Sequence, residues 1–390
     1  MNFRPILFRA IFFVAFGLLV VTSFGQPLKW SADGNSYLTT EEGSIVKYTL
    51  PTLEKSVVVS KDLLKPTGSD TPLKIEGFSI TEDGSRAMIY TNSKRVWRQK
   101  TRGDYWLLDI GSKSLKQLGK DRPASTLMFA KLSPDGTKAA YVSERNVYVE
   151  DLATGSIKKL TDDLGTKKLI NGTFDWVYEE EFFCRDGFRW APDSKSIAYW
   201  QIDANKIRDF YMINNTDSVY SQIVPVEYPK VGDPPSPARI GVVDINTAKT
   251  TWMNVPGDPA QHYITRMEWT PDGKEALVQQ LNRKQNESKL MRRNPKSGNA
   301  QTIYTDRDDA WISSVNEWSG ESTGWYWLDG GQRFLWPSEK DGWMHLYLVS
   351  SDGKKETLLT PGDYDVIKLD RIDEKGGLVY FTASPNNATQ

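Results

Sequence analysis

One short turn cassette recurs along the chain and restricts its fold more than any other feature. Most copies have an aromatic or apolar residue, then a small residue, often a proline, then Asp-Gly and an apolar stretch. The copies occupy residues 30–34, 78–84, 132–136, 190–194, 269–273 and 327–330, with a weaker seventh near 374–376. A motif that repeats over the whole length of a chain indicates a repeat architecture.

The cassette has the chemistry of a tight turn between two strands. Proline fixes φ at the second position of a turn, aspartate caps the turn with its side chain, and glycine adopts positive φ. After the turn at 134–136 come apolar stretches at 139–142 and 147–149, a turn at 153–155 and a further stretch from Ile157. This pattern predicts a small antiparallel sheet in each repeat.

The spacing of the cassettes indicates how the sheets are arranged. Successive turn aspartates are roughly 45 to 58 residues apart, which is the size of a four-stranded propeller blade. The 14 Trp, 17 Tyr and 15 Phe also favour strands over helices. We therefore predict an all-β fold, a β-propeller of four-stranded blades, with about seven blades begun in this chain.

One interval between cassettes is longer than the others. It measures about 79 residues, between Asp193 and Asp272, and it includes a proline-rich stretch. A loop of this length cannot be buried without leaving backbone groups unpaired, so it lies on the surface. We expect it to form an arm that projects from one blade at about 207–237.

The first 25 residues have the pattern of an export signal. Arg4 and Arg9 precede an apolar stretch at 10–21, and the small residues Ser23 and Gly25 stand where a signal peptidase cuts. An uncleaved membrane anchor is the alternative, but the stretch is shorter than the roughly 20 residues that span a bilayer. We expect residues 26–390 to form the mature domain, exported to the periplasm or outside the cell.

The charge balance and the single cysteine exclude some partners and bonds. Lysine plus arginine (49) nearly equals aspartate plus glutamate (50), and no basic run occurs, so no nucleic-acid partner is expected. Cys184 is the only cysteine, so the chain cannot form an internal disulfide. We interpret it as a half-buried packing thiol, with a catalytic thiol as the alternative.

An acidic segment at 171–183 interrupts the strand pattern before the fourth cassette. Asp175 is suited to cap a short helix whose first turn holds Glu179, Glu180 and Glu181. By spacing alone, three glutamates near a helix start fit a solvated face.

Aromatic residues in the same segment favour a fixed site instead. They are Trp176, Tyr178, Phe182 and Phe183, which would hold the segment against a blade. Two adjacent carboxylates near a cavity repel each other, and a ligand ammonium between them would relieve this cost through charge-assisted hydrogen bonds. A metal ion is the competing ligand, but a hard cation needs more oxygen ligands than this segment offers. We expect neither a metal nor a cofactor.

The sequence of residues 175–181 is Asp-Trp-Val-Tyr-Glu-Glu-Glu. It resembles a motif of the dipeptidyl peptidase IV family and matches that motif at every position. Members of the family are serine exopeptidases of the prolyl oligopeptidase class. Further similar segments follow in order at 190–193, 197–199, 228–232 and 338–343. The resemblance therefore covers nearly the whole mature chain.

The resemblance implies roles for individual residues. In the family the last two glutamates of the motif bind the substrate's α-ammonium, which implies this role for Glu180 and Glu181. An arginine of a Trp-Arg pair binds a substrate carbonyl, and Arg98 is its counterpart here; a surface arginine stacked on Trp97 is the alternative. The supporting residues of the motif are Asp175, Trp176, Tyr178 and Glu179.

The resemblance also implies a homodimer that forms through the arm, at about 207–232. The family often has an aromatic residue near the pocket after a Gly-Trp pair. This chain has Trp-Ile-Ser-Ser-Val at 311–315 instead, so that contact is not carried over.

No catalytic residue is expected in this chain. The family's C-terminal α/β-hydrolase domain carries a Gly-x-Ser-x-Gly elbow, which this sequence lacks. His262 and His345 fit packed strands better than catalytic bases. Since the family's propeller has eight blades, we expect the chain to be truncated before a hydrolase domain of the same polypeptide, which would supply the Ser-Asp-His triad.

These features predict the substrate-gating propeller of a secreted serine-type aminopeptidase. It would release dipeptides of the X-Pro or X-Ala type from peptides with a free N-terminus. One alternative is a prolyl tripeptidyl peptidase, whose pocket admits one more residue. The other is a non-catalytic propeller that binds protein N-termini.

Overall fold

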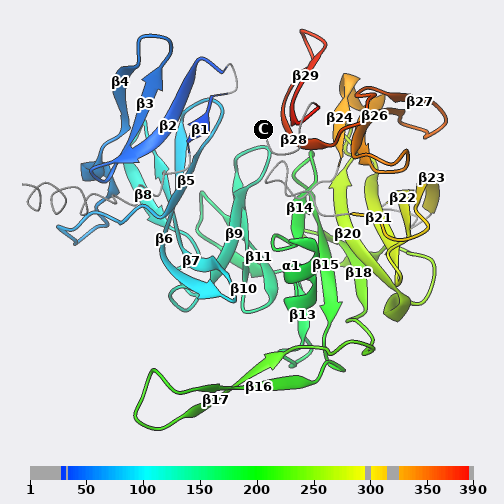
Figure 1. Ribbon diagram of the computed structural model, residues 1–390. Helices are drawn as coiled ribbons and strands as arrows, with labels where there is room; N and C mark the ends of the chain where they lie inside the picture. The colour runs from blue at the N-terminus through cyan, green and yellow to red at the C-terminus, as the bar shows by residue number, and fades with distance from the viewer. Residues whose placement is uncertain (1–27, 32–33, 295–299, 314–324, 386–390) are drawn as a thin grey trace, which may run out of the picture. The chain divides into compact units, whose positions relative to one another are not determined.

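The computed structural model describes residues 28–31, 34–294, 300–313 and 325–385, and antiparallel strands dominate them (Figure 1). The predicted export signal at 1–25 and Asp33 of the first cassette lie outside the described residues. Within the part of the chain that the structure describes, no helix is long and apolar enough to cross a membrane.

The chain divides into two compact units. One holds the described residues up to Thr91 together with Trp106–Lys116, and the other holds Asn92–Tyr105 and the described residues from Gln117 onward. The first sheet lies in the first unit and pairs its strands in chain order: β1 (Lys29–Trp30), β2 (Ser36–Glu41), β3 (Ser44–Thr49) and β4 (Glu54–Val59). A 3-10 helix, η1 (Lys61–Leu64), follows.

The next four strands belong to an eight-stranded sheet. They are β5 (Gly77–Ile80), β6 (Arg86–Val96), β7 (Gln99–Asp109) and β8 (Ser114–Gln117). The core of the first unit is apolar and includes Ile45, Leu64, Ile89 and Leu108. The Asn92–Tyr105 end of the β6–β7 hairpin belongs to the second unit.

The second unit repeats the same plan of antiparallel sheets. The other four strands of the eight-stranded sheet are β9 (Leu127–Leu132), β10 (Lys138–Ser143), β11 (Asn146–Asp151) and β12 (Ile157–Lys159), and β9 pairs with β7. The next has β13 (Leu169–Asn171), β14 (Phe188–Trp190), β15 (Ser196–Asp203), β18 (Ala238–Asp244) and β19 (Thr250–Trp252). After η2 (Pro259–Gln261) come β20 (His262–Trp269), β21 (Ala276–Asn282), β22 (Glu287–Arg293) and β23 (Ala300–Arg307).

The last described sheets complete this series. One has β24 (Tyr326–Leu328), β25 (Arg333–Ser338), β26 (His345–Ser350) and β27 (Glu356–Leu358), with η3 (Asp329–Gly331) between its first two strands. The other is the pair β28 (Val366–Asp373) and β29 (Leu378–Ala383). These sheets are the blades of the predicted all-β propeller, because each is built from strands that follow one another in the chain.

The cassettes form the turns that their chemistry predicts. In the third copy, Asp135 accepts hydrogen bonds from the Ser133 hydroxyl at 2.6 Å and from the Thr137 backbone N–H at 3.0 Å, and Gly136 has a φ of 68°. Aspartate in the second copy has the same contacts, and its hydrogen bonds from Thr81 and Ser85 lower the pKa of Asp83 to about 2.

The fourth cassette has a serine where the others have glycine. Ser194 takes a φ of 60°, and its hydroxyl accepts a hydrogen bond from the Asp135 backbone N–H at 3.0 Å. Left-handed backbone is unfavourable for a residue with a side chain. The side chain offsets this cost by joining two neighbouring turns.

The long interval between cassettes contains a separate two-stranded ribbon. Strands β16 (Asp209–Asn214) and β17 (Gln222–Glu227) pair only with each other among the described strands, and Figure 1 shows them extending away from β15 and β18. Several apolar side chains of the ribbon are exposed, including Tyr211, Ile213 and Ile223. We call the segment 207–237 the arm.

Candidate functional site

Helix α1 (Trp176–Phe182) begins at the capping residue that the sequence predicts. The Asp175 carboxylate accepts a hydrogen bond from the Tyr178 backbone N–H at 3.1 Å, which is the usual N-cap contact. Its other oxygen accepts one from the Ser236 hydroxyl at 2.6 Å. Burial raises the pKa of Asp175, while these two hydrogen bonds favour its charged form. The cap therefore joins the start of α1 to the base of the arm.

Aromatic side chains hold α1 in place on its buried face. Tyr178 and Phe182 are almost fully buried, and the Tyr178 hydroxyl accepts a hydrogen bond from the Ile264 backbone N–H at 3.0 Å. Trp176 contacts Tyr228 of the arm, with 4.3 Å between ring centroids. The expectation for Phe183 is wrong, because this residue ends the helix in a left-handed conformation and is 40% exposed.

The three glutamates of the motif lie in three different environments. Glu179 is buried and pairs with Arg185 at 3.3 Å; burial raises the pKa of Glu179, and the guanidinium opposes this shift. Glu180 is partly buried and forms an ion pair with Arg98. Glu181 is exposed, and its carboxylate forms no hydrogen bond or ion pair within the described residues. The three glutamates are therefore not equally exposed to solvent, as their spacing alone would allow.

Arg98 reaches Glu180 from the tip of the β6–β7 hairpin. The residue before it, Trp97, has a φ of 47°, which turns the chain between the two strands. The hairpin end is fastened to β9, because Gly103 pairs with Leu127 and Asp104 accepts a hydrogen bond from the Ser125 backbone N–H at 2.6 Å. Two predicted site residues that are far apart in the sequence are thus in contact.

A pocket of about 640 Å³ lies beside Glu181. Its walls come from α1, from the arm and from the chain around β20 and β21. The lining includes Trp176, Val177, Glu181, Phe182, Tyr228, Pro229, Lys230, Val231, Asp233, Pro235, Tyr263, Arg283 and Gln285. We call it the arm pocket. Sequence reasoning did not find it, because three segments far apart in the chain form its walls.

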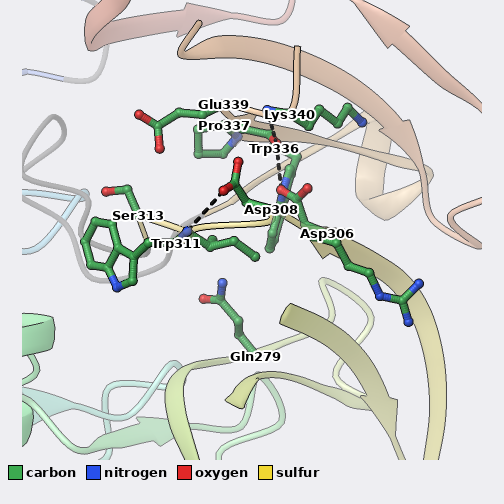
Figure 2. Close-up of a pocket in the computed structure, with 12 residues that line it drawn as sticks. Gln279, Asp306, Asp308, Trp311, Ser313, Trp336, Pro337, Glu339 and Lys340 are labelled. Carbon is green, nitrogen blue, oxygen red and sulfur yellow. Dashed lines mark hydrogen bonds between the residues drawn. The ribbon is translucent and has the colours of Figure 1, made fainter. Parts of the chain in front are cut away.

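A second, much smaller pocket lies at the ends of β23 and β25 (Figure 2). Its volume is about 30 Å³, enough for little more than a water molecule. Asp306, Asp308 and Glu339 lie around it, and burial together with the Asp365 and Asp308 carboxylates raises the pKa of Glu339. In the described ranges, no group of three or more His, Cys, Asp or Glu side chains is arranged to hold a metal ion.

The acidic side chains of this second pocket are held by hydrogen bonds. Asp306 accepts from the Trp336 indole at 3.1 Å and from the Ser338 hydroxyl at 2.6 Å. Asp308 accepts from the Trp311 backbone N–H at 3.0 Å (Figure 2). Trp311 is 51% exposed. The rest of the predicted 311–315 segment, Ser314 and Val315, lies outside the described residues.

Cys184 and the two histidines are packed inside the sheets. Cys184 is buried rather than half-buried, its thiol lies 3.2 Å from the Thr265 carbonyl oxygen, and burial raises its pKa. His262 and His345 are buried at the first positions of β20 and β26. These surroundings suit structural roles for the three side chains.

Comparisons with known proteins agree on one family. A sequence model described as the dipeptidyl peptidase IV (DPP IV) N-terminal region matches residues 81–390. A dipeptidyl peptidase 4 from Trichophyton rubrum is 25% identical over 366 residues, which cover 92% of this chain and 45% of the relative. A probable dipeptidyl peptidase 4 from Emericella nidulans is also 25% identical, over 93% of this chain and 47% of the relative.

Solved structures show the same fold. The dipeptidyl peptidase 4 of Porphyromonas gingivalis superposes with a TM-score of 0.82 at 24% identity, over 92% of this chain and 50% of that one. A putative dipeptidyl aminopeptidase IV from Bacteroides ovatus gives a TM-score of 0.70 at 19% identity, over 91% of this chain and 49% of that one. This likeness confirms the β-propeller fold. The chain spans about half the length of the proteins that it resembles.

Proposed function

This chain belongs to the family of dipeptidyl peptidase IV N-terminal regions, and from that premise we propose that it gates substrates for an exported serine exopeptidase. The enzyme would release dipeptides of the X-Pro or X-Ala type from peptides with a free N-terminus. A hydrolase domain of the same polypeptide would supply the triad, and this domain would select which peptide bond reaches it.

The observation that carries the proposal is the contact between Arg98 and Glu180 next to the free carboxylate of Glu181. A substrate ammonium between the two glutamates would form charge-assisted hydrogen bonds with both. The Arg98 guanidinium has five N–H donors, so it can keep its ion pair and still donate to a substrate carbonyl. Together the three side chains would fix the first residue of the peptide.

When the N-terminus of the substrate is fixed, its position determines which substrate carbonyl lies next to the nucleophile of the hydrolase domain. We assign this positioning to the propeller. The contacts that hold α1 in place suit this positioning role. The buried pair of Glu179 with Arg185 and the cap at Asp175 hold the helix from both ends. A clamp on a rigid support loses less entropy when the substrate binds.

The proposal is tested by the variants Glu180→Gln and Glu181→Gln in the full-length protein. We expect each variant to lower kcat/KM for an X-Pro p-nitroanilide at least tenfold, or roughly 1.4 kcal/mol, because the ammonium loses a charged acceptor. The preference for this substrate over its N-acetylated form should shrink as well. Glu54→Gln, an exposed glutamate of β4, is the control. Normal kinetics in both variants would contradict the assignment.

The two alternatives give different results in the same assays. A prolyl tripeptidyl peptidase would cleave X-X-Pro substrates in preference to X-Pro ones. A non-catalytic propeller would bind peptides with a free N-terminus without cleaving them. Reading the gene downstream of Gln390 for a Gly-x-Ser-x-Gly elbow with a later Asp and His separates an enzyme from a binding module.

The arm supports a further part of the proposal, a homodimer. Its ribbon presents exposed apolar side chains on two strands that, among the described strands, pair only with each other. Exposed apolar patches of this kind mark protein interaction sites. A second copy of the chain is the partner that we propose for this surface.

A further inference from the structure

We infer that the end of the β6–β7 hairpin attracts peptides whose acidic residues follow the first two, and so selects them as substrates. This inference rests on the proposed function, because it concerns peptides whose ammonium binds at the clamp. We call residues 94–102 the cationic tip. The segment contains no acidic residue and five cationic ones, which are Lys94, Arg95, Arg98, Lys100 and Arg102.

The cationic tip is open to solvent. Lys94, Arg95 and Lys100 are exposed, and the Arg98 side chain is 74% exposed although it pairs with Glu180. The side chains of Lys94 and Arg95 form no ion pair within the part of the chain that the structure describes. These two charges are therefore available to a ligand. The near-neutral balance of the whole chain conceals this local excess.

The cationic tip lies close to the proposed clamp. Arg98 is in contact with Glu180, and Arg95 is only three residues away along the hairpin, a distance of roughly 10 Å at most. This is about the distance over which charges act through a solution of 0.1 M salt. A negatively charged peptide that approaches the clamp would therefore be attracted by the tip.

Another arginine extends the positive charge toward α1. The Arg145 backbone carbonyl accepts a hydrogen bond from the Asn171 N–H at 3.0 Å, in the segment that leads to the helix. Partial loss of hydration and the charge of Arg145 both lower the pKa of Arg102. The two guanidinium groups therefore repel each other, although Glu227 pairs with Arg145 at 3.4 Å. A nearby acidic side chain of a ligand would relieve this repulsion.

A peptide with an N-terminal ammonium and acidic residues further along matches this arrangement of charges. Its ammonium would bind at the free carboxylate of Glu181, while its acidic side chains would lie in the field of the cationic tip. Complementary charges of this kind speed association and favour one orientation. An anionic lipid surface fits less well, because the Glu181 carboxylate would repel it.

The test compares two amidated peptides in the full-length protein, Ala-Pro-Ala-Glu-Glu and Ala-Pro-Ala-Gln-Gln. They have the same shape and differ by two negative charges. We expect the wild type to have a kcat/KM about tenfold higher for the acidic peptide at low salt, through a lower KM. The ratio should fall below about twofold in 0.5 M NaCl, where the charges are screened. Release of Ala-Pro, followed by chromatography, provides the measurement.

The variant Lys94→Gln/Arg95→Gln removes the two cations of the tip that have no ion pair. It should lower the ratio for the two peptides about threefold at low salt, because half of the attraction to two glutamates is lost. The matched control is Lys354→Gln/Lys355→Gln, which removes two exposed lysines from the turn between β26 and β27. This control should keep the wild-type ratio. Ala-Pro p-nitroanilide has no acidic group, so both variants should cleave it at the wild-type rate.

The outcomes separate this inference from the function on which it rests. If the wild type does not cleave Ala-Pro p-nitroanilide, the proposed function fails and the inference fails with it. If the wild type cleaves it but treats the two peptides equally at low salt, the function stands and the inference is wrong.

Two further results would also overturn the inference. A ratio that the tip variant leaves unchanged, or that the lysine control lowers equally, would assign the preference to other charges. If the tip variant instead loses binding to phosphatidylglycerol vesicles and keeps the wild-type ratio, the cationic tip contacts lipid and not the substrate.

Discussion

Glu180 and Glu181 are neighbours in the sequence, but their carboxylates have different surroundings. Successive residues of an α-helix are about 100° apart around its axis, so adjacent side chains point in different directions. Glu180 has a side chain that is 19% exposed and pairs with Arg98, while Glu181 faces the arm pocket. A substrate ammonium would therefore meet one carboxylate that already has a cation and one that is free.

A double-mutant cycle on the Arg98–Glu180 pair tests whether this contact operates during turnover. We expect Arg98→Gln and Glu180→Gln each to lower kcat/KM. The loss of kcat/KM in the double variant should be about fivefold smaller than the product of the two single losses. This difference corresponds to a coupling energy of roughly 1 kcal/mol. The reason is that either change alone leaves the other side chain without its partner. The measurement is kcat/KM for an X-Pro p-nitroanilide in all four proteins. Strictly multiplicative losses would mean that the two side chains act separately.

Helix α1 shows what a sequence pattern can and cannot predict about an element. The Asp175 cap follows from local chemistry, since the carboxylate bonds to a backbone N–H three residues later. The blades were predictable in the same way, because the turn cassettes between their strands also depend on local hydrogen bonds of an aspartate. The exposure of Phe183 was not predictable, because it depends on where the helix ends and on which neighbouring strand covers it.

Contacts between segments that are far apart in the chain could not be predicted from the sequence pattern. The family resemblance implies that Arg98 and Glu180 touch the same substrate, but it did not predict the ion pair between them. The bond between Ser236 and Asp175 had no signal at all, because a serine at the base of a long insertion has no distinctive spacing. Such contacts are fixed by how the blades and the arm fold together.

The helix cap yields a prediction at the scale of the element. Asp175→Ala should destabilise the protein by about 1–2 kcal/mol, because the first turn of α1 loses its acceptor and the Ser236 hydroxyl loses its partner. It should also raise KM for an X-Pro substrate, since the glutamates of the clamp lie on this helix. Unfolding in urea, followed by tryptophan fluorescence, and steady-state kinetics provide the two measurements.

The control for this prediction is another cap in the same unit. Asp258 caps η2 by accepting a hydrogen bond from the Ala260 backbone N–H at 2.9 Å, and η2 carries none of the proposed site residues. Asp258→Ala should reduce stability but leave KM unchanged. If Asp175→Ala changes stability alone, α1 does not need its cap to position the clamp.

At the scale of the whole molecule, the arm forms one wall of a pocket and carries an exposed ribbon. The chain that follows β17 supplies Tyr228 and Val231 to the arm pocket, and the ribbon offers an apolar surface to a second copy. In the ribbon, Ile213 and Ile223 are direct cross-strand partners, so their exposed side chains lie on the same face. This face is the part of the arm that we expect to be buried in a dimer.

The dimer is tested by placing charges on that face of the ribbon. We expect the full-length wild type to have the mass of a dimer in size-exclusion chromatography with light scattering, and Ile213→Asp/Ile223→Asp to have that of a monomer. Two buried aspartates at a self-complementary interface would face like charges across the symmetry axis and lose their hydration. Leu53→Asp, at an exposed site between β3 and β4, should remain a dimer. A double variant that keeps the wild-type mass would assign the contact between copies to another surface, and the exposed ribbon would then need a different partner.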